Sequence, residues 1–262
     1  MEYVFKRLYG DDPTSRFLVA DEVGLGKTLV ARGIIAKTIE HLQDSVGRID
    51  IVYICSNATI ASQNIKRLKM RGLDEYLQAL GNRARTDERI TFATRLTYLP
   101  KEVQSLNGNK VNFISLTPNT TFDHTRSRGG HADERAILYR MLYDLPLGQD
   151  EGRRRWRVGL LNILQATAGK ENWRTKARNL PAADLDPDIT NAFRQAVLDD
   201  AELYAALKEG CERFARYRDY RKIPWEDSEL RYNLIGTLRG KLASVCLSAL
   251  EPDLVILDEF QR

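Results

Sequence analysis

Short, almost continuous apolar runs recur along the chain and predict buried β-strands. Four of them cover Phe17–Ala20, Ile51–Cys55, Asn112–Leu116 and Leu254–Leu257, and a less regular fifth covers Arg89–Ala93. Strands that are apolar on both faces are typical of parallel sheets, whose faces are covered by helices. The pattern therefore predicts an α/β fold built on a parallel sheet.

Helical periodicity follows the first of these runs and dominates the middle of the chain. A helix that starts near Lys27 presents an apolar stripe to the sheet, and residues 124–231 show helical spacing with no convincing strand. A sheet of four βα units and a last strand needs only about 120–150 residues. We therefore predict a lobe made of residues 1–123 and 232–262, interrupted by a helical insertion at 124–231. The apolar positions that carry this periodicity are Val30, Ile34, Ile35, Ile39, Ile137, Met141, Leu145, Trp156, Leu160, Ile163, Phe193, Val197 and Tyr204.

Composition and charge narrow the class of protein without indicating a function. Of the 262 residues 43% are hydrophobic and 29% charged, which is typical of a globular chain with a core. We expect a cytoplasmic protein with no membrane partner, because no apolar run reaches the ~20 residues of a transmembrane helix and the first residues do not form a signal peptide. The three cysteines are too widely spaced for a disulfide framework or a zinc site, so buried thiols are expected.

The strongest chemical signal follows the first apolar run. Ala20–Thr28 joins the expected strand to the expected helix through a turn that contains glycines. Gly24 and Gly26 let the backbone approach a phosphate, and Lys27 can reach the β- and γ-phosphates of a nucleotide. Thr28 can bind Mg²⁺. The residues predicted to bind ATP are Gly24, Leu25, Gly26, Lys27 and Thr28.

A second expected strand ends in two adjacent carboxylates. Asp258 and Glu259 directly follow the run Leu254–Leu257, which is the form of a Walker B motif. Open α/β sheets bind their ligands at the carboxyl ends of their strands. The pattern alone is common in structural strands, but together with the phosphate loop it indicates an ATPase.

The two motifs resemble those of the superfamily II helicases and translocases. Ala20–Thr28 has the Ala-Asp-Glu-x-Gly-Leu-Gly-Lys-Thr form of Swi/Snf-type ATPases, in which Asp21 stands where the strict phosphate-loop pattern has glycine. The resemblance implies a RecA-like P-loop NTPase lobe that binds ATP and Mg²⁺, with Asp258 holding the metal. It implies catalytic roles for Lys27 and for Glu259, which would polarise the attacking water. In the full-length protein, ATP hydrolysis would drive movement on nucleic acid, with double-stranded DNA favoured over RNA.

Two strand ends carry weaker signals for nucleic acid. Ser56 and Asn57 follow one expected strand and Thr117 follows the next, where the family contacts the nucleic-acid backbone. Hydroxyl and amide groups can contact phosphates there. The same residue types also cap helices and form turns, so both interpretations stay open.

Two basic segments of the expected insertion carry a further signal. Arg213, Arg216 and Tyr217 belong to a stretch that interleaves basic and aromatic residues, and residues 153–157 form a second such cluster. Grooves of this composition bind single-stranded nucleic acid. The alternative is an ordinary solvated helix face with its aromatic rings turned to the core.

Two further functions are compatible with the sequence. One is a switch ATPase that binds a protein partner through the helical insertion and moves no nucleic acid. The other is a nucleotide-binding scaffold that has lost catalysis. The family's enzymes also need a second RecA-like lobe in the same chain, whose arginines complete the ATP site. Because this sequence ends four residues after Asp258, we expect it to be a piece of a longer protein or a truncated reading frame.

The 262-residue chain is accordingly expected to bind Mg-ATP weakly and to hydrolyse it at a negligible rate. The reason is that an arginine supplied by a second lobe contributes ~10³–10⁵-fold to phosphoryl transfer. Phosphate release by the purified chain, with and without duplex DNA, measures this. Turnover that DNA stimulates would contradict the expectation.

Overall fold

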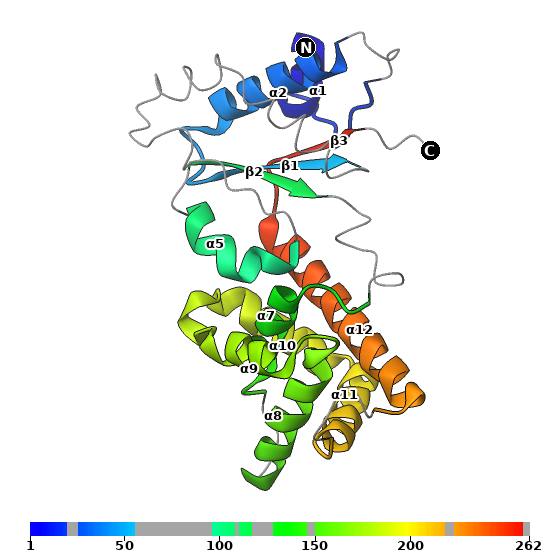
Figure 1. The fold of residues 1–262 in the computed structure, drawn as a ribbon. Coiled ribbons are helices and arrows are strands. Elements are labelled where there is room, and N and C mark those ends of the chain that lie inside the picture. The colour runs from blue at the N-terminus through cyan, green and yellow to red at the C-terminus, as the bar shows by residue number, and fades with distance from the viewer. Residues whose placement is uncertain are drawn as a thin grey trace. The chain divides into compact units, whose positions relative to one another are not determined.

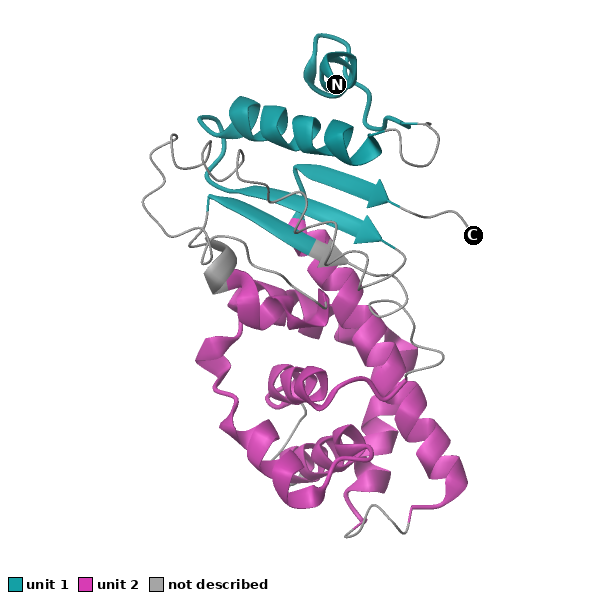
Figure 2. Ribbon diagram, turned by 45° about the horizontal axis from the view of Figure 1, so that its top comes forward, with its two compact units in different colours: residues 1–94, 105–119, 251–262 teal, residues 95–104, 120–250 magenta. Residues whose placement is uncertain are grey.

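The computed structural model describes residues 1–19, 26–55, 96–107, 110–116, 128–145, 150–217 and 223–258 (Figure 1). The chain divides into two compact units (Figure 2). One comprises residues 1–94, 105–119 and 251–262, and the other comprises residues 95–104 and 120–250. We refer to them as the sheet unit and the helical unit. The domain boundary expected at residue 232 falls inside one continuous helix of the helical unit, α12 (Trp225–Leu250).

Three parallel strands form the sheet, in the order β2–β1–β3 (Figure 1). They are β1 (Ile49–Cys55), β2 (Val111–Leu116) and β3 (Leu254–Asp258). In the central strand, Ile51 pairs with Phe113 on one side and Leu254 on the other. The parallel α/β sheet predicted from the apolar runs is confirmed for these strands.

The first expected strand is not formed in the part of it that the structure describes. Residues 17–19 have no regular secondary structure, and Phe17, Leu18 and Val19 are 37%, 85% and 37% exposed. An apolar run becomes a strand only where a neighbouring strand satisfies its backbone groups. Residues 17–19 pair with none of the three described strands. The fifth expected strand, residues 89–93, lies outside the described residues.

A buried aspartate joins all three strands near their amino ends. The Asp50 carboxylate accepts a hydrogen bond from Asn112 Nδ2 at 2.9 Å and pairs with Arg48 at 2.7 Å. The Asp50 N–H donates to Asp253 Oδ2 at 2.8 Å, and the Asp253 N–H donates back to the Asp50 carbonyl at 3.0 Å. Because these bonds link β1 to β2 and to the start of β3, they fix the register of the sheet.

One helix covers a face of this sheet. α2 (Lys27–Leu42) buries Ile34, Ile35 and Ile39, as its spacing predicts, while Val30 is only half-buried. Residues 43–48 join the helix to the start of β1, so α2 runs antiparallel to the strands (Figure 2). Its N-terminus therefore lies at the edge where the strands end. The strand residues packed under α2 are Ile49, Ile51, Tyr53, Cys55, Val111 and Phe113.

A short helix that the apolar pattern did not predict precedes α2. α1 (Glu2–Tyr9) packs on α2 through Phe5 and Tyr9, whose ring centroids lie 5.8 and 5.3 Å from that of His41. The Tyr9 hydroxyl donates a hydrogen bond to the Asp253 carbonyl at 3.1 Å. This bond ties α1 to the residue just before β3.

The helical unit contains the helices expected of the insertion. All the apolar positions that predicted them are buried except Tyr204, which is half-buried. Two thiols of this unit, Cys211 and Cys246, and Cys55 of the sheet are free and buried as expected, and burial raises the pKa of Cys211 and Cys246. The elements that begin in this unit are η1 (Leu96–Tyr98), α5 (Leu99–Asn107), α7 (Ala132–Leu142), α8 (Asp150–Gln165), α9 (Lys170–Asn179), η2 (Ala182–Asp184), α10 (Pro187–Asp199), α11 (Ala201–Phe214) and α12. No helix in the described parts of the chain has both the length and the apolar character needed to span a bilayer.

A buried ion pair holds α7 against α12. Glu134 and Arg239 are 1% and 2% exposed, and Glu134 Oε1 lies 3.3 Å from Arg239 Nη2. The same oxygen accepts from Thr97 Oγ1 at 2.7 Å, while Oε2 accepts from the His131 N–H at 2.6 Å in a capping box. Gly130 has φ +53°, and a Cβ there would lie 2.3 Å from Arg239 Nε. The backbone before α7 therefore requires glycine.

Replacing Glu134 is expected to destabilise the helical unit strongly. Glu134→Ala leaves Arg239 buried without its counter-ion, and breaking a buried pair in this way costs about 3–5 kcal/mol. Urea unfolding followed by circular dichroism measures the loss, and Glu134→Gln, which keeps an acceptor, should lose less. The control is Glu209→Ala, an exposed carboxylate on α11, which should change stability by at most about 0.5 kcal/mol. Equal stability of Glu134→Ala and the control would contradict the stabilising role of the buried ion pair.

Candidate functional site

The residues of both nucleotide motifs that the structure describes lie at one edge of the sheet unit. The strands are parallel and end together at Cys55, Leu116 and Asp258, and Cys55 pairs directly with Asp258. The N-terminus of α2 lies at the same edge (Figure 2). Lys27 and Asp258, which are 231 positions apart in the sequence, are thus brought to one side of the fold.

Asp258 projects from the face of the sheet that α2 covers. Side chains alternate along a strand, and Leu254 and Ile256 pack against the core under α2. Val255 and Leu257 face the opposite way and are 42% and 67% exposed. Since Asp258 continues the series of Leu254 and Ile256, its carboxylate shares their face.

A tyrosine of the central strand orients this carboxylate. The Tyr53 hydroxyl donates a hydrogen bond to Asp258 Oδ2, and the Tyr53 ring is buried under α2. The motifs did not single out Tyr53. The signal that could have found it is the alternation of β1, because Tyr53 shares a face with Cys55, the pairing partner of Asp258.

The start of α2 has the features of an anion site. Gly26 caps the helix with φ +92°, a left-handed conformation that favours glycine, and its carbonyl accepts from the Leu29 and Val30 N–H groups at 2.8 and 3.0 Å. The first turn contains Lys27 and Thr28 and no acidic residue. A helix N-terminus has partial positive charge and N–H groups that bind phosphate, and here no carboxylate of the first turn competes for them.

These residues fit a nucleotide with its magnesium ion. Mg²⁺ binds oxygen ligands and is held by one or two protein groups together with substrate phosphates. The Thr28 hydroxyl and the Asp258 carboxylate are ligands of this kind. Among the residues that the structure describes, no three or more His, Cys, Asp and Glu side chains cluster as a metal site. A metal shared with phosphate does not require such a cluster.

Several predicted site residues cannot be compared with the structure. They lie outside the described residues, and their roles stay predictions. They are Gly24 and Leu25 of the phosphate loop, Glu259 of the acidic pair, and Ser56, Asn57 and Thr117 at the strand ends.

The basic and aromatic residues at the end of α11 and just after it make contacts within the helical unit. Arg213 forms an ion pair with Asp227, a buried carboxylate of α12, and the Tyr217 hydroxyl donates a hydrogen bond to the same carboxylate. Arg216 lies between them and is exposed. Two of the three side chains thus join the end of α11 to α12. Their role in binding nucleic acid stays a prediction.

No protein-family model, curated protein or solved structure matches this chain. Its class is therefore defined by the fold alone. It is a mixed α/β protein with a small parallel three-stranded sheet and a predominance of helices.

The bond between Tyr53 and Asp258 should be measurable as a coupling energy. Tyr53→Phe keeps the buried ring and removes the donor to a carboxylate, so we expect a loss of about 1–2 kcal/mol in unfolding free energy. A double-mutant cycle with Asp258→Ala isolates the pair. Tyr3→Phe, at a tyrosine that is 68% exposed, is the control and should have no effect. Additive losses for Tyr53→Phe and Asp258→Ala would contradict the interaction.

Proposed function

We propose that this chain is the ATP-binding lobe of a nucleic-acid-dependent ATPase, a RecA-like P-loop lobe similar to those of Swi/Snf-type helicases and translocases. In the full-length protein, together with a second RecA-like lobe, it would couple ATP hydrolysis to movement along double-stranded DNA. One observation carries the proposal: the start of α2 and the end of β3 lie at the same edge of the sheet and on the same face.

Each described residue of the site has a distinct task in this proposal. Gly26 allows the backbone N–H groups at the start of α2 to face the phosphates, and Lys27 adds a positive charge beside them. Thr28 and Asp258 would hold magnesium, which would supply positive charge to the nucleotide phosphates. Tyr53 is a positioning residue, because it orients the Asp258 carboxylate.

Glu259 completes the proposal by resemblance. In the helicase family the second carboxylate of this motif polarises the water that attacks the γ-phosphate. Hydrolysis also requires charge stabilisation by arginine, which the family takes from its second lobe. Binding of Mg-ATP, rather than turnover, is therefore the property to test on the 262-residue chain.

Lys27→Ala is expected to weaken the binding of Mg-ATP. Loss of one charge-assisted hydrogen bond to phosphate, about 1.5–3 kcal/mol, corresponds to about 10- to 100-fold in affinity. Isothermal titration of the 262-residue chain with Mg-ATP measures the change. The matched control is Lys37→Ala, which removes a lysine from the same helix, one that pairs with Glu2 at 2.6 Å, and should leave the affinity unchanged. Equal affinities of the two variants for Mg-ATP would contradict the role of Lys27 in binding the nucleotide phosphates.

A switch ATPase that binds a protein partner is the second candidate function. The helical unit favours it in one respect, because that unit has its own buried ion pair and core and could form a binding module. The ATPase rate of the full-length protein with and without DNA, at increasing salt, separates the two functions. Stimulation that falls steeply with salt indicates nucleic acid, because binding to DNA releases counter-ions.

A further inference from the structure

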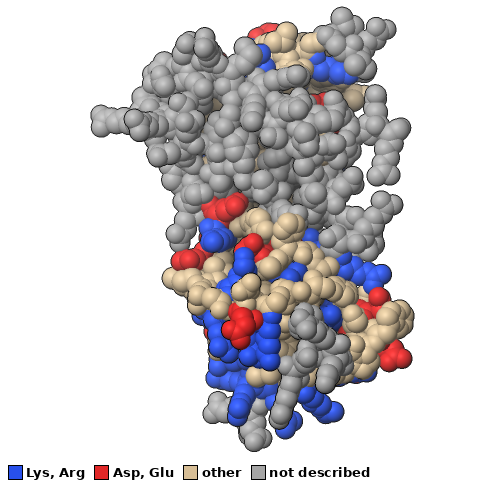
Figure 3. Space-filling model, in the orientation of Figure 1, with Lys and Arg blue, Asp and Glu red and all other residues tan. Residues whose placement is uncertain are grey.

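Positive charge is concentrated in one stretch of the helical unit. Residues 153–178 contain eight arginines and lysines and a single carboxylate, a net charge of +7, whereas the whole chain has a net charge of +4. The rest of the molecule is therefore net acidic. This stretch forms most of α8 and most of α9, and Lys and Arg side chains gather over that end of the unit (Figure 3).

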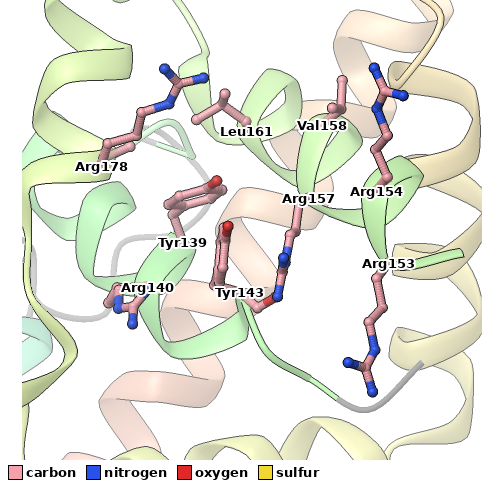
Figure 4. Close-up of a pocket in the computed structure, with 10 residues that line it drawn as sticks. Tyr139, Arg140, Tyr143, Arg153, Arg154, Arg157, Val158, Leu161 and Arg178 are labelled. Carbon is pink, nitrogen blue, oxygen red and sulfur yellow. The ribbon is translucent and has the colours of Figure 1, made fainter. Parts of the chain in front are cut away.

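A cavity of about 530 Å³ opens within this basic surface, between α7, α8 and α9 (Figure 4). No carboxylate is among the residues that line it. An anion in this cavity would thus meet several guanidinium groups, of which Arg157 is already paired with Asp144. The arginines of the lining are Arg140, Arg153, Arg154, Arg157 and Arg178.

The floor of the cavity is held in place by aromatic and ionic contacts. The Arg157 guanidinium lies 4.1 Å from the centroid of the Tyr143 ring, and that of Arg140 lies 5.3 Å from it. Arg157 also pairs with Asp144 at 2.7 Å. Tyr139, only 4% exposed, packs against Tyr143 with 5.5 Å between ring centroids. These contacts restrict the rotamers of the floor residues, so less conformational entropy is lost when a ligand binds.

Hydrogen-bond donors surround the cavity. The Tyr139 phenol can donate at neutral pH as any tyrosine can, and burial raises its pKa further, to about 12. Arg153, Arg154 and Arg178 are exposed and line the cavity. A guanidinium can bind phosphate through two parallel hydrogen bonds. Phosphate is therefore the chemical group that this arrangement suits best.

We propose that this cavity and its arginine rim bind the phosphodiester backbone of nucleic acid. The basic stretch is longer than the cavity lining, because Arg155 on α8 and Arg174 on α9 belong to the stretch and do not line the cavity. A repeating polyanion can engage such a surface along its length, whereas a small anion would use the cavity alone. Contacts of this kind are independent of base sequence. The inference rests on the proposed function in taking nucleic acid as the polyanion, but it requires no bound ATP.

The test is the binding of a short fluorescent DNA duplex to the 262-residue chain without nucleotide. The fluorescence anisotropy of the duplex measures its affinity at a series of salt concentrations. The variant Arg153→Gln/Arg154→Gln/Arg178→Gln removes three exposed charges of the rim. Each phosphate contact contributes ~0.9 to the slope of log affinity against log salt, so the slope should decrease by about 2–3. We expect affinity near physiological salt to fall by about tenfold or more.

The control is Lys6→Gln/Lys101→Gln/Lys208→Gln, which removes the same charge from exposed lysines outside the cavity and should keep the wild-type slope. Circular dichroism verifies that both variants are folded. Duplex affinity and salt slope equal to wild type in the arginine variant would overturn the proposal. So would a loss of inorganic tripolyphosphate binding with duplex affinity unchanged, because the cavity would then be a site for small anions.

The ATP site is tested separately from the cavity in the same assay. Lys27→Ala should bind the duplex as the wild-type chain does when no nucleotide is present. If Lys27→Ala fails to affect Mg-ATP binding while the arginine variant loses DNA, the proposed function fails and the cavity assignment stands. If Lys27→Ala weakens Mg-ATP binding while the arginine variant still binds the duplex as the wild-type chain does, the cavity assignment alone is overturned.

Discussion

The position of the candidate nucleotide site depends on the hydrogen bonds of Asp50 at the opposite edge of the sheet. Its carboxylate binds Asn112 of β2, and its backbone exchanges bonds with Asp253 at the start of β3. The register set there continues along β1 and leaves Cys55 opposite Asp258. A slip of one residue would turn Asp258 to the face away from α2. The carboxylate would then be on the wrong side of the sheet for Lys27.

A long helical segment between β2 and β3 is compatible with this arrangement. The cost of closing a loop grows only with the logarithm of its length, at about 0.6 kcal/mol for each doubling. The helical unit also contributes its own core and the buried pair of Glu134 and Arg239. Sheet and helices therefore have separate sources of stability. The two proposed anion sites differ accordingly: one uses the backbone at a helix N-terminus, and the other uses guanidinium side chains.

The apolar pattern predicted those elements whose stability comes from burial along a single segment. The three strands and α2 were found because their apolar positions are contiguous or have helical spacing. The run at residues 17–19 was misread, since a strand also needs a paired neighbour, which the pattern cannot supply. Of the candidate site, the start of α2 and Asp258 were selected by the motifs, and their roles stay predictions. Tyr53 was missed because its role depends on the register between β1 and β3.

The basic cavity was predictable only in part, because it is assembled from three helices. The cluster at residues 153–157 is visible in the sequence, but its neighbours Arg140 on α7 and Arg178 on α9 reach it only through packing. Packing also explains why the basic stretch around the end of α11 has fewer unshared charges than its sequence indicates. Its Arg213 and Tyr217 contact the buried Asp227, a carboxylate from another helix that sequence spacing does not connect to them.

The central claim is that a nucleotide with its metal binds between the start of α2 and the end of β3. The most direct test is a titration of the chain with Mn²⁺-ATP, in which nuclear magnetic resonance monitors the amide signals. Manganese replaces magnesium at oxygen-rich sites and broadens the signals of nearby nuclei. The account predicts selective broadening of the amides of Gly26, Lys27 and Thr28, and of Asp258 at the end of β3. Broadening confined to the arginine cavity of the helical unit, or none at all, would contradict it.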